Sequence, residues 1–136
     1  MSDPREILAG TSTIVVVGAS RDPGKSAHSV PLQMMRHGWR IIPVNPFVDQ
    51  IFGVRAYPSL ADVPEPLDMV NVFRPSADAL DVVKAAVEIG ARSIWLQQDI
   101  VNAEARRLAE AAGIPYVEDR CLAVERALGR LSRVSG

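Results

Sequence analysis

The sequence contains one cysteine, Cys121, among its 136 residues. A single cysteine cannot form an internal disulfide, and it cannot supply a cysteine-rich zinc site. The two histidines, His28 and His37, have no acidic residue placed to complete a metal triad with them. The sequence therefore predicts no structural or catalytic metal.

Long apolar runs and an excess of charge are also missing. No run is long enough to span a bilayer, and residues 1–6 lack the basic and apolar regions of a secretory signal. We therefore expect a cytoplasmic protein with no membrane partner. The formal net charge of -1 does not provide the basic face that nucleic-acid binding requires, so we expect no nucleic-acid partner.

The sequence does have the apolar content of a folded domain. Hydrophobic residues make up 48% of the 136 positions, which is enough for one buried core. We therefore predict a single domain over residues 1–136, with residues 1–10 and 132–136 peripheral to it. No repeat, linker or low-complexity segment interrupts the chain.

Apolar segments of strand length alternate with segments of helical periodicity. Residues 13–17 are all β-branched, and their apolar side chains fall on both faces of the expected strand. This is typical of a central parallel strand that is covered on both faces. The remaining pattern predicts strands at 39–44, 67–73, 92–96 and 114–117, a short edge strand at 54–57, a helical turn at 59–63, and helices at 29–37, 77–89 (capped by Ser76), 102–112 (opened by Asn102) and 121–131.

This alternation predicts the fold class. Strands that alternate with helices form βαβ units, and these assemble into a parallel sheet. We expect a single α/β domain of Rossmann type, doubly wound, with a mainly parallel sheet of five to six strands flanked by helices. Ligands of such sheets bind beyond the carboxyl ends of the strands. The candidate site segments are therefore 18–28, 44–47, 73–76 and 96–99.

The loop after the first strand carries groups that can bind phosphate. The N-terminus of the following helix offers unpaired backbone N–H groups and a partial positive charge. Ser20 adds a hydroxyl, and Arg21 and Lys25 add full positive charges. The alternative interpretation is an ordinary surface loop with two solvated cations.

Two familiar nucleotide sites match this loop poorly. Residues 19–26 fit a loose Walker A pattern, but Ala19 replaces the first glycine and no predicted strand ends in the aspartate that would hold magnesium. A dinucleotide fingerprint fails because Ser20 occupies the second glycine position. Asn45 also stands where an acidic residue would bind the ribose hydroxyls.

Five short motifs occur in order along the chain. Together they resemble the small stand-alone CoA-binding proteins, whose fold is similar to the CoA-binding domain of the succinyl-CoA synthetase α subunit. The resemblance extends from about Ile14 to Glu125. The motifs are Val16-Val17-Gly18-Ala19-Ser20, Pro43-Val44-Asn45-Pro46, Val72-Phe73-Arg74-Pro75, Trp95-Leu96-Gln97 and Asp119-Arg120-Cys121-Leu122-Ala123-Val124-Glu125.

The resemblance implies a cofactor, coenzyme A, and a role for each motif. The phosphate end would involve Gly18, Ala19 and Ser20 facing the diphosphate, with Arg21 or Lys25 balancing its charge. Val44, Asn45 and Pro46 would border the adenosine. Phe73, Arg74 and Pro75 would line the pantetheine path, and Gln97 would lie near the outer rim. Such a division suits a ligand with a charged head and a long arm.

Two positions depart from the family pattern. Asp99 stands where members often have a glycine, and it would add negative charge near an anionic ligand. Arg126 stands where members often have a histidine, so no role of that histidine can be transferred to this chain.

The sequence shows no nucleophile paired with a base, so we predict no catalytic residue. We expect a module that binds CoA or an acyl-CoA. The alternatives are an NAD(P)-binding Rossmann protein and an accessory subunit that completes a partner acyl-CoA enzyme; a homo-oligomer is also open. We expect Trp39 and Trp95 in the core or an interface, and Cys121 as a small buried residue or a reactive thiol.

Overall fold

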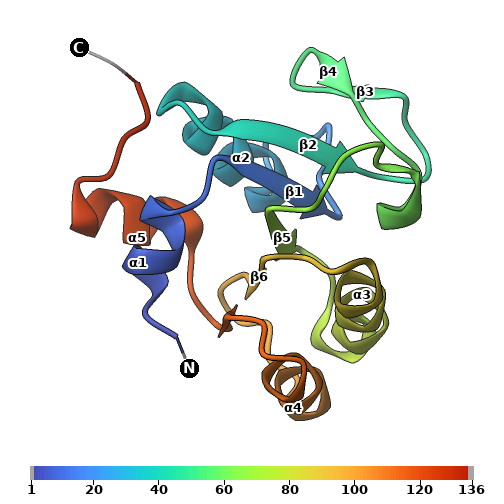
Figure 1. Cartoon of the computed structure of the whole chain (residues 1–136). Helices are drawn as coiled ribbons and strands as arrows, with labels where there is room; N and C mark the ends of the chain where they lie inside the picture. The colour runs from blue at the N-terminus through green and yellow to red at the C-terminus, as the bar shows by residue number, and fades with distance from the viewer. Residues whose placement is uncertain (1, 135–136) are drawn as a thin grey trace.

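Five strands form one parallel sheet in the computed structural model, which describes residues 2–134 (Figure 1). Their order across the sheet is β2-β1-β5-β6-β7, and every pair of neighbours runs parallel. This confirms the predicted fold class. The strands are β1 (Thr13–Val17), β2 (Arg40–Val44), β5 (Met69–Val72), β6 (Ser93–Leu96) and β7 (Tyr116–Val117).

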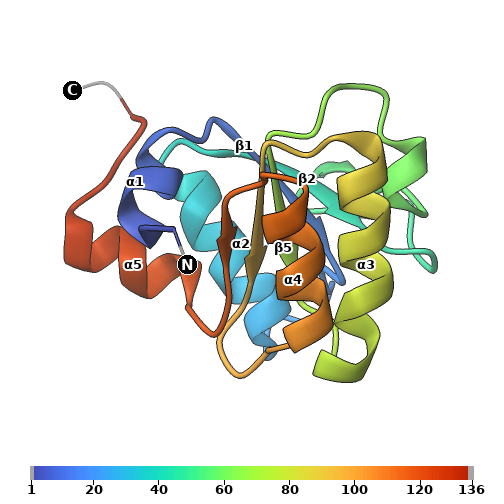
Figure 2. The same ribbon diagram turned by 60° about the horizontal axis from the view of Figure 1, so that its bottom comes forward.

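Helices cover both faces of the sheet, as Figure 2 shows. Alternate residues of β1 enter two separate cores, because successive side chains of a strand point to opposite faces. Val15 and Val17 pack on the side of α3 and α4, whereas Ile14 and Val16 pack on the side of α1, α2 and α5. The helices are α1 (Pro4–Ala9), α2 (Ser26–Arg36), the 3-10 turn η1 (Leu60–Asp62), α3 (Ser76–Ile89), α4 (Ala103–Ala111) and α5 (Leu122–Gly129).

The order of the strands creates a switch point beside β1. The chain leaves β1 through α2 toward β2 on one side, and β5 lies on the other side of β1. α2 and α3, which follow β1 and β5, therefore cover opposite faces, and their N-terminal ends diverge at the carboxyl edge of the sheet. A ligand crevice is therefore expected at the carboxyl ends of β1, β2 and β5.

The segment predicted as an edge strand, residues 54–57, does not form an edge strand of the main sheet. Its first two residues form β4 (Val54–Arg55), which pairs with β3 (Gln50–Ile51) as a separate antiparallel hairpin. Phe52 and Gly53 make the tight turn, with φ of 60° and 73°. Two successive residues with positive φ are typical of a two-residue hairpin turn. Of the predicted segment, Tyr57 alone bridges to the main sheet, beside Val44.

The N-terminal segment, expected to be peripheral, contributes to the core. Asp3 caps α1 by accepting hydrogen bonds from the backbone N–H groups of Arg5 and Glu6, and Leu8 is fully buried. At the other end, Arg133 donates its N–H to the carbonyl of His37 at 2.8 Å. Residues 135 and 136 lie outside the described part of the chain.

The predicted helix ends are partly confirmed. Asn102 caps α4 by accepting a hydrogen bond from the N–H of Ala105 at 2.9 Å, and Gly90 ends α3 in the left-handed region. Ser76 is not the cap of α3: that position is Pro75, and the Ser76 hydroxyl accepts from the N–H of Val101. Both tryptophans are in the core, as expected, with at most 2% exposed.

Among the helices described between residues 2 and 134, none combines the length and the apolar character needed to cross a membrane.

Tyr116 is an unusual core residue: its side chain is only 1% exposed, and its hydroxyl lies beside the Glu118 carboxylate without a hydrogen bond of good geometry to any group in residues 2–134. Burial, together with the nearby Glu118 carboxylate, raises the pKa of Tyr116 above its ordinary value. The folded state therefore keeps this proton where the unfolded chain loses it. The corresponding stability is present below the unfolded pKa of about 10 and is lost as pH rises above it.

We predict that Tyr116→Phe changes the free energy of unfolding by no more than about 1 kcal/mol at neutral pH, because the buried hydroxyl makes no hydrogen bond of good geometry whose loss would be costly. Above a pH of about 10 the variant loses less stability than the wild type. Urea unfolding across this pH range measures both effects, and Tyr57→Phe serves as the control. A steeper alkaline loss in Tyr116→Phe would contradict the prediction.

Candidate functional site

A groove of about 490 Å³ lies at the carboxyl ends of β1 and β2, between η1 and α3. It brings together five of the residues predicted from the sequence, namely Gly18, Val44, Asn45, Pro46 and Arg74. Its other lining residues are Val17, Phe47, Pro58, Ser59, Leu60, Asp81, Val82 and Ala85. The sequence predictions missed all of the walls that η1 and α3 contribute, since nothing in those segments marks a ligand site.

The remaining predicted residues do not line this groove. Ala19 is fully buried beneath the loop, and Phe73 is half-buried against the core on the α2 side of the sheet. Ser20 is half-buried, whereas Arg21, Lys25 and Pro75 are exposed. The groove and the loop after β1 are therefore neighbours at one edge of the sheet.

Gly18 occupies the tightest point of this edge. Its φ is +93°, and a Cβ at this position would lie 2.7 Å from the carbonyl oxygen of Phe73. Its N–H donates to the carbonyl of Val44 at 3.0 Å, so the residue contacts the ends of both neighbouring strands. Only glycine satisfies both the positive φ and the close approach.

The loop after Gly18 is organised by its own side chains. The hydroxyl of Ser20 accepts from the N–H of Asp22 at 3.0 Å, and the carboxylate of Asp22 accepts from the N–H of Gly24 at 2.9 Å. His28 donates from Nδ1 to the carbonyl of Ser20 at 2.7 Å, which requires the Nδ1–H form of the ring. These bonds hold the loop over the start of α2.

The start of α2 keeps its backbone donors free. Lys25 is the N-cap and its side chain makes no capping hydrogen bond. The N–H groups of Ser26 and Ala27, the first two helical residues, have no acceptor within the described chain. Together with the exposed cations of Arg21 and Lys25, they form a site that suits a phosphate group.

Asn45 is committed to the protein itself. Its Nδ2 donates to the carbonyl of Ala19 at 2.9 Å, and its Oδ1 accepts from the N–H of Phe47 at 2.8 Å. The side chain therefore ties the loop after β1 to the loop after β2 and leaves no carboxylate for ribose hydroxyls. The same bond positions Phe47, whose side chain is 90% exposed at the groove.

Arg74 is the one cation among the residues that line the groove in the described chain. It forms an ion pair of 3.4 Å with Asp78, and both side chains are about half exposed. Asp81 lies on the same wall, so the guanidinium is partly balanced by acidic neighbours. An exposed pair of this kind is weak, and an anionic ligand can compete for the arginine.

The Trp-Leu-Gln motif and the start of α5 bind each other. Trp95 donates from its indole N–H to the carbonyl of Arg120 at 2.8 Å, and Gln97 accepts at Oε1 from the N–H of Leu122 at 3.4 Å. Gln97 is only 4% exposed. Its amide oxygen is used at the N-terminus of α5, and its expected place near the outer rim of a CoA site stays a prediction.

Asp99 and Arg126, which depart from the family pattern, and the single cysteine each have a defined place in the structure. Asp99 adopts a φ of +69°, a conformation that glycine takes without strain, and its N–H donates to the carboxylate of Asp119. Arg126 donates to the carbonyl of Leu131, just beyond the end of α5. Cys121 is the N-cap of α5, makes no capping bond, and packs half-buried against the core.

The described residues contain no group of three or more His, Cys, Asp or Glu side chains arranged to hold a metal ion.

Comparison with known sequences assigns the sheet and most of its helices to one family. The model of the CoA-binding domain matches residues 12–127, from the start of β1 through most of α5. The chain belongs to the CoA-binding domain family. The matched range includes the groove, the loop after β1 and the bonded Trp95–Arg120 pair.

Relatives of this CoA-binding domain differ in length. The uncharacterized protein YneT of Bacillus subtilis is 39% identical over 124 residues, which cover 91% of this chain and 92% of YneT. The solved hypothetical protein from Pyrococcus horikoshii OT3 is 33% identical, with a TM-score of 0.90 over 95% of this chain and 91% of that one. The ADP-forming acetate–CoA ligase II of Archaeoglobus fulgidus is 28% identical over 72% of this chain, which spans only 15% of the ligase.

We predict that Gly18→Ala lowers the free energy of unfolding by about 2–4 kcal/mol, since it combines backbone strain with a clash against the Phe73 carbonyl. Gly53→Ala is the matched control: its φ is +73°, but no atom lies within 4 Å of the added methyl. The control should cost about 1 kcal/mol from strain alone. Equal losses for the two variants in urea unfolding would show that the close approach at Gly18 is not constraining.

Proposed function

We propose that this chain binds coenzyme A or an acyl-CoA at the carboxyl edge of its sheet, as a binding module without catalysis of its own. The observation that carries the proposal is the groove of about 490 Å³ beside the free N-terminus of α2, in a chain of the CoA-binding domain family. CoA has an adenosine, a charged phosphate region and a long arm, and this edge offers a surface for each.

The adenosine belongs in the groove. Val44 and Pro46 border it, and Phe47 stands at its margin with an almost fully exposed ring. An exposed aromatic ring beside an apolar groove is suited to stack on a purine, and such stacking is worth about 1–3 kcal/mol per base in nucleic-acid complexes. Arg74 lines the same groove, and its guanidinium is the cation available there to bind the 3′-phosphate.

The diphosphate belongs at the loop after β1. Backbone N–H groups of Ser26 and Ala27 and the charges of Arg21 and Lys25 are available there. Gly18, Ala19 and Ser20 shape the turn. From this point the pantetheine arm would pass Phe73 and Pro75.

The geometry disfavours the alternative nucleotides. NAD binding in Rossmann folds uses a carboxylate after the second strand, whereas Asn45 is there and its amide is already bonded on both sides. A magnesium-dependent triphosphatase needs a carboxylate at a strand end, and β2, β5 and β6 end in Val44, Val72 and Leu96.

A second candidate function is that of an accessory subunit that supplies the CoA site to a partner acyl-CoA enzyme. The observation that favours it is the match to a 15% portion of an acetate–CoA ligase, whose remaining length has no counterpart in this chain. Both candidates use the same groove, and they differ in whether a partner protein provides the chemistry.

We predict that CoA and acetyl-CoA raise the melting temperature more than NAD, NADP or ATP with magnesium do at equal millimolar concentration. A ligand that binds only the folded state stabilises by mass action, so the ranking reports relative affinity. Thermal unfolding followed by tryptophan fluorescence measures this. If ATP with magnesium gives the largest shift, the proposal is wrong and the Walker interpretation is supported.

We further predict that Arg74→Ala weakens CoA binding by about ten- to a hundredfold but leaves dephospho-CoA unaffected, because a charge-assisted hydrogen bond contributes about 1.5–3 kcal/mol.

Lys25→Ala should weaken both ligands by a similar factor, because both carry the diphosphate. Phe47→Ala should weaken both, whereas Phe47→Trp should preserve binding. Isothermal calorimetry measures the affinities.

The matched control is Arg107→Ala, an exposed cation on α4. If Arg74→Ala weakens CoA no more than this control does, Arg74 does not contact the 3′-phosphate.

A further inference from the structure

The outer edge of β2 has no complete strand partner. β2 is the terminal strand of the sheet, and among residues 2–134 only Tyr57 pairs with its free side. Tyr57 donates its N–H to the carbonyl of Pro43 at 3.0 Å and accepts from the N–H of Asn45 at 2.9 Å. The pairing then stops, because the chain before Tyr57 turns away into the β3–β4 hairpin.

The backbone of Ile41 is left unpaired at this edge. Arg40 donates its N–H to Ser12, and Val44 accepts from Gly18, so the backbone groups of the even-numbered residues of β2 face β1. Those of Ile41 therefore face outward. Outside the ladder with β1, neither its N–H nor its C=O has a hydrogen-bond partner in the described chain, and the residue as a whole is only 3% exposed, at the floor between Met35 and Val54.

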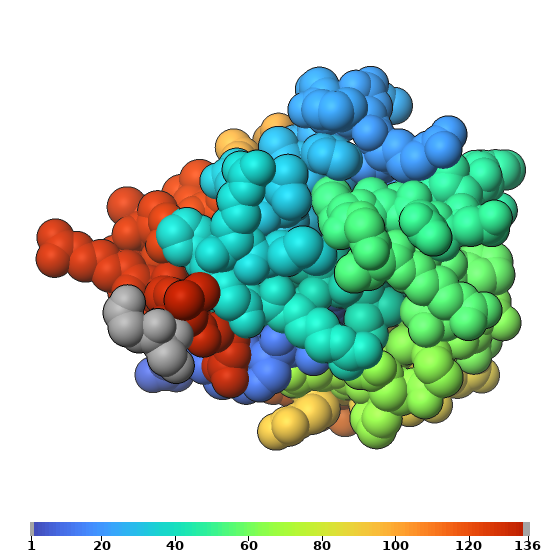
Figure 3. Space-filling view, turned by 90° about the horizontal axis from the view of Figure 1, so that it is seen from above, coloured from blue at the N-terminus to red at the C-terminus, as the bar shows by residue number. Residues whose placement is uncertain are grey.

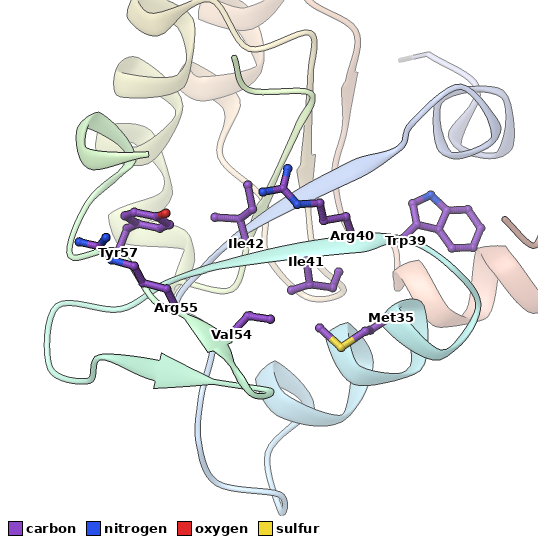
Figure 4. Close-up of a pocket in the computed structure, with 8 residues that line it drawn as sticks. All are labelled: Met35, Trp39, Arg40, Ile41, Ile42, Val54, Arg55 and Tyr57. Atoms are coloured by element: carbon purple, nitrogen blue, oxygen red, sulfur yellow. The ribbon is translucent and has the colours of Figure 1, made fainter. Parts of the chain in front are cut away.

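A groove of about 330 Å³ opens along this edge, between α2, β2 and the β3–β4 hairpin. In Figure 3, α2 and the green hairpin segment flank the hollow. Figure 4 shows that Arg40 and Ile42 point to one side of β2 and Ile41 to the other. The lining residues are Met35, Trp39, Arg40, Ile41, Ile42, Val54, Arg55 and Tyr57, none of which lines the groove assigned to CoA.

The two sides of this edge differ in chemistry. Ile41, Met35 and Val54 make one side apolar, and Val54 is 37% exposed (Figure 4). Arg55 stacks over the ring of Tyr57, 5.0 Å from its centroid, and has no carboxylate within ion-pair distance in residues 2–134.

Arg40, in contrast, is neutralised by a two-pronged ion pair with Glu65. Arg55 is therefore the uncompensated charge of this groove.

We propose that the free edge of β2 docks an extended segment of a partner protein by strand addition, with an acidic side chain toward Arg55 and an apolar side chain toward Val54 and Met35. Strand addition supplies partners for the Ile41 backbone, and side chains of an added strand alternate between the two faces. A second copy of this chain fits less well, because its own β2 edge lies at the base of the same groove and it would bring a second Arg55.

The test uses the ¹⁵N-labelled whole chain and a probe peptide, acetyl-Val-Glu-Val-Glu-Val-amide. In the free protein, we expect the Ile41 amide to exchange with solvent faster than the amide of Ile42, which faces β1. Addition of the peptide at millimolar concentration should shift the Ile41 signal and slow its exchange. A peptide with lysine in place of glutamate should bind about fivefold more weakly, as expected for an exposed charge pair.

Arg55→Glu should invert this preference for the two peptides without changing CoA affinity, since Arg55 is not in the CoA groove. The outcome separates this proposal from the proposed function, because each can fail alone. Equal binding of both peptides, shifts away from β2, no shift at Ile41, or slow exchange of the free Ile41 amide would overturn the docking proposal. N-methyl groups on the central valine and on both glutamates should abolish the shift, because they block the strand-pairing hydrogen bonds in either strand direction.

Discussion

The close approach of backbone at Gly18 is the constraint on which the rest of the site depends. At this residue the chain leaves β1, contacts the carbonyl of Val44 on one side and approaches the carbonyl of Phe73 on the other. Because three strand ends converge without an intervening side chain, the loops that follow them lie at one edge. The start of α2, the turn at Asn45 and the guanidinium of Arg74 then lie around the same edge, where we propose that CoA binds.

Several residues of the sequence motifs form hydrogen bonds that join neighbouring loops at this edge of the sheet. Asn45 joins the first two loops through Ala19, and Trp95 joins the end of β6 to the start of α5 through the Arg120 carbonyl. Gln97 does the same through Leu122. Such bonds explain why polar residues occur at strand ends that are themselves buried. They also keep the carboxyl edge rigid, which lowers the cost of ordering it around a ligand.

The sequence predicted the elements whose signal is local. The apolar run of β1, the cap at Asn102 and the glycine after α3 were correctly interpreted, because strand periodicity and helix ends depend on neighbouring residues. The position of the β3–β4 hairpin was missed, since its turn at Phe52 and Gly53 lacks the usual asparagine or aspartate. α1 was missed although Asp3 and Pro4 are good signals for a helix start.

The site was predictable in part for the same reason. Residues at strand ends, such as Gly18 and Val44, could be placed at the carboxyl edge from topology alone. The walls from Ser59 and Val82 could not, because their approach to the groove is decided by how η1 and α3 pack, which no local pattern encodes. The bond between Gln97 and Leu122 could not be predicted, because the two residues lie 25 positions apart in the chain.

The most direct test of the CoA site is a titration of the ¹⁵N-labelled protein with CoA, followed amide by amide. The account predicts the largest shifts at Ser26 and Ala27, whose N–H groups are free, and at Phe47 beside the groove, with the Ile41 amide at the opposite edge of β2 unchanged. Shifts confined to the β2 edge, or no shifts at millimolar CoA, would contradict it.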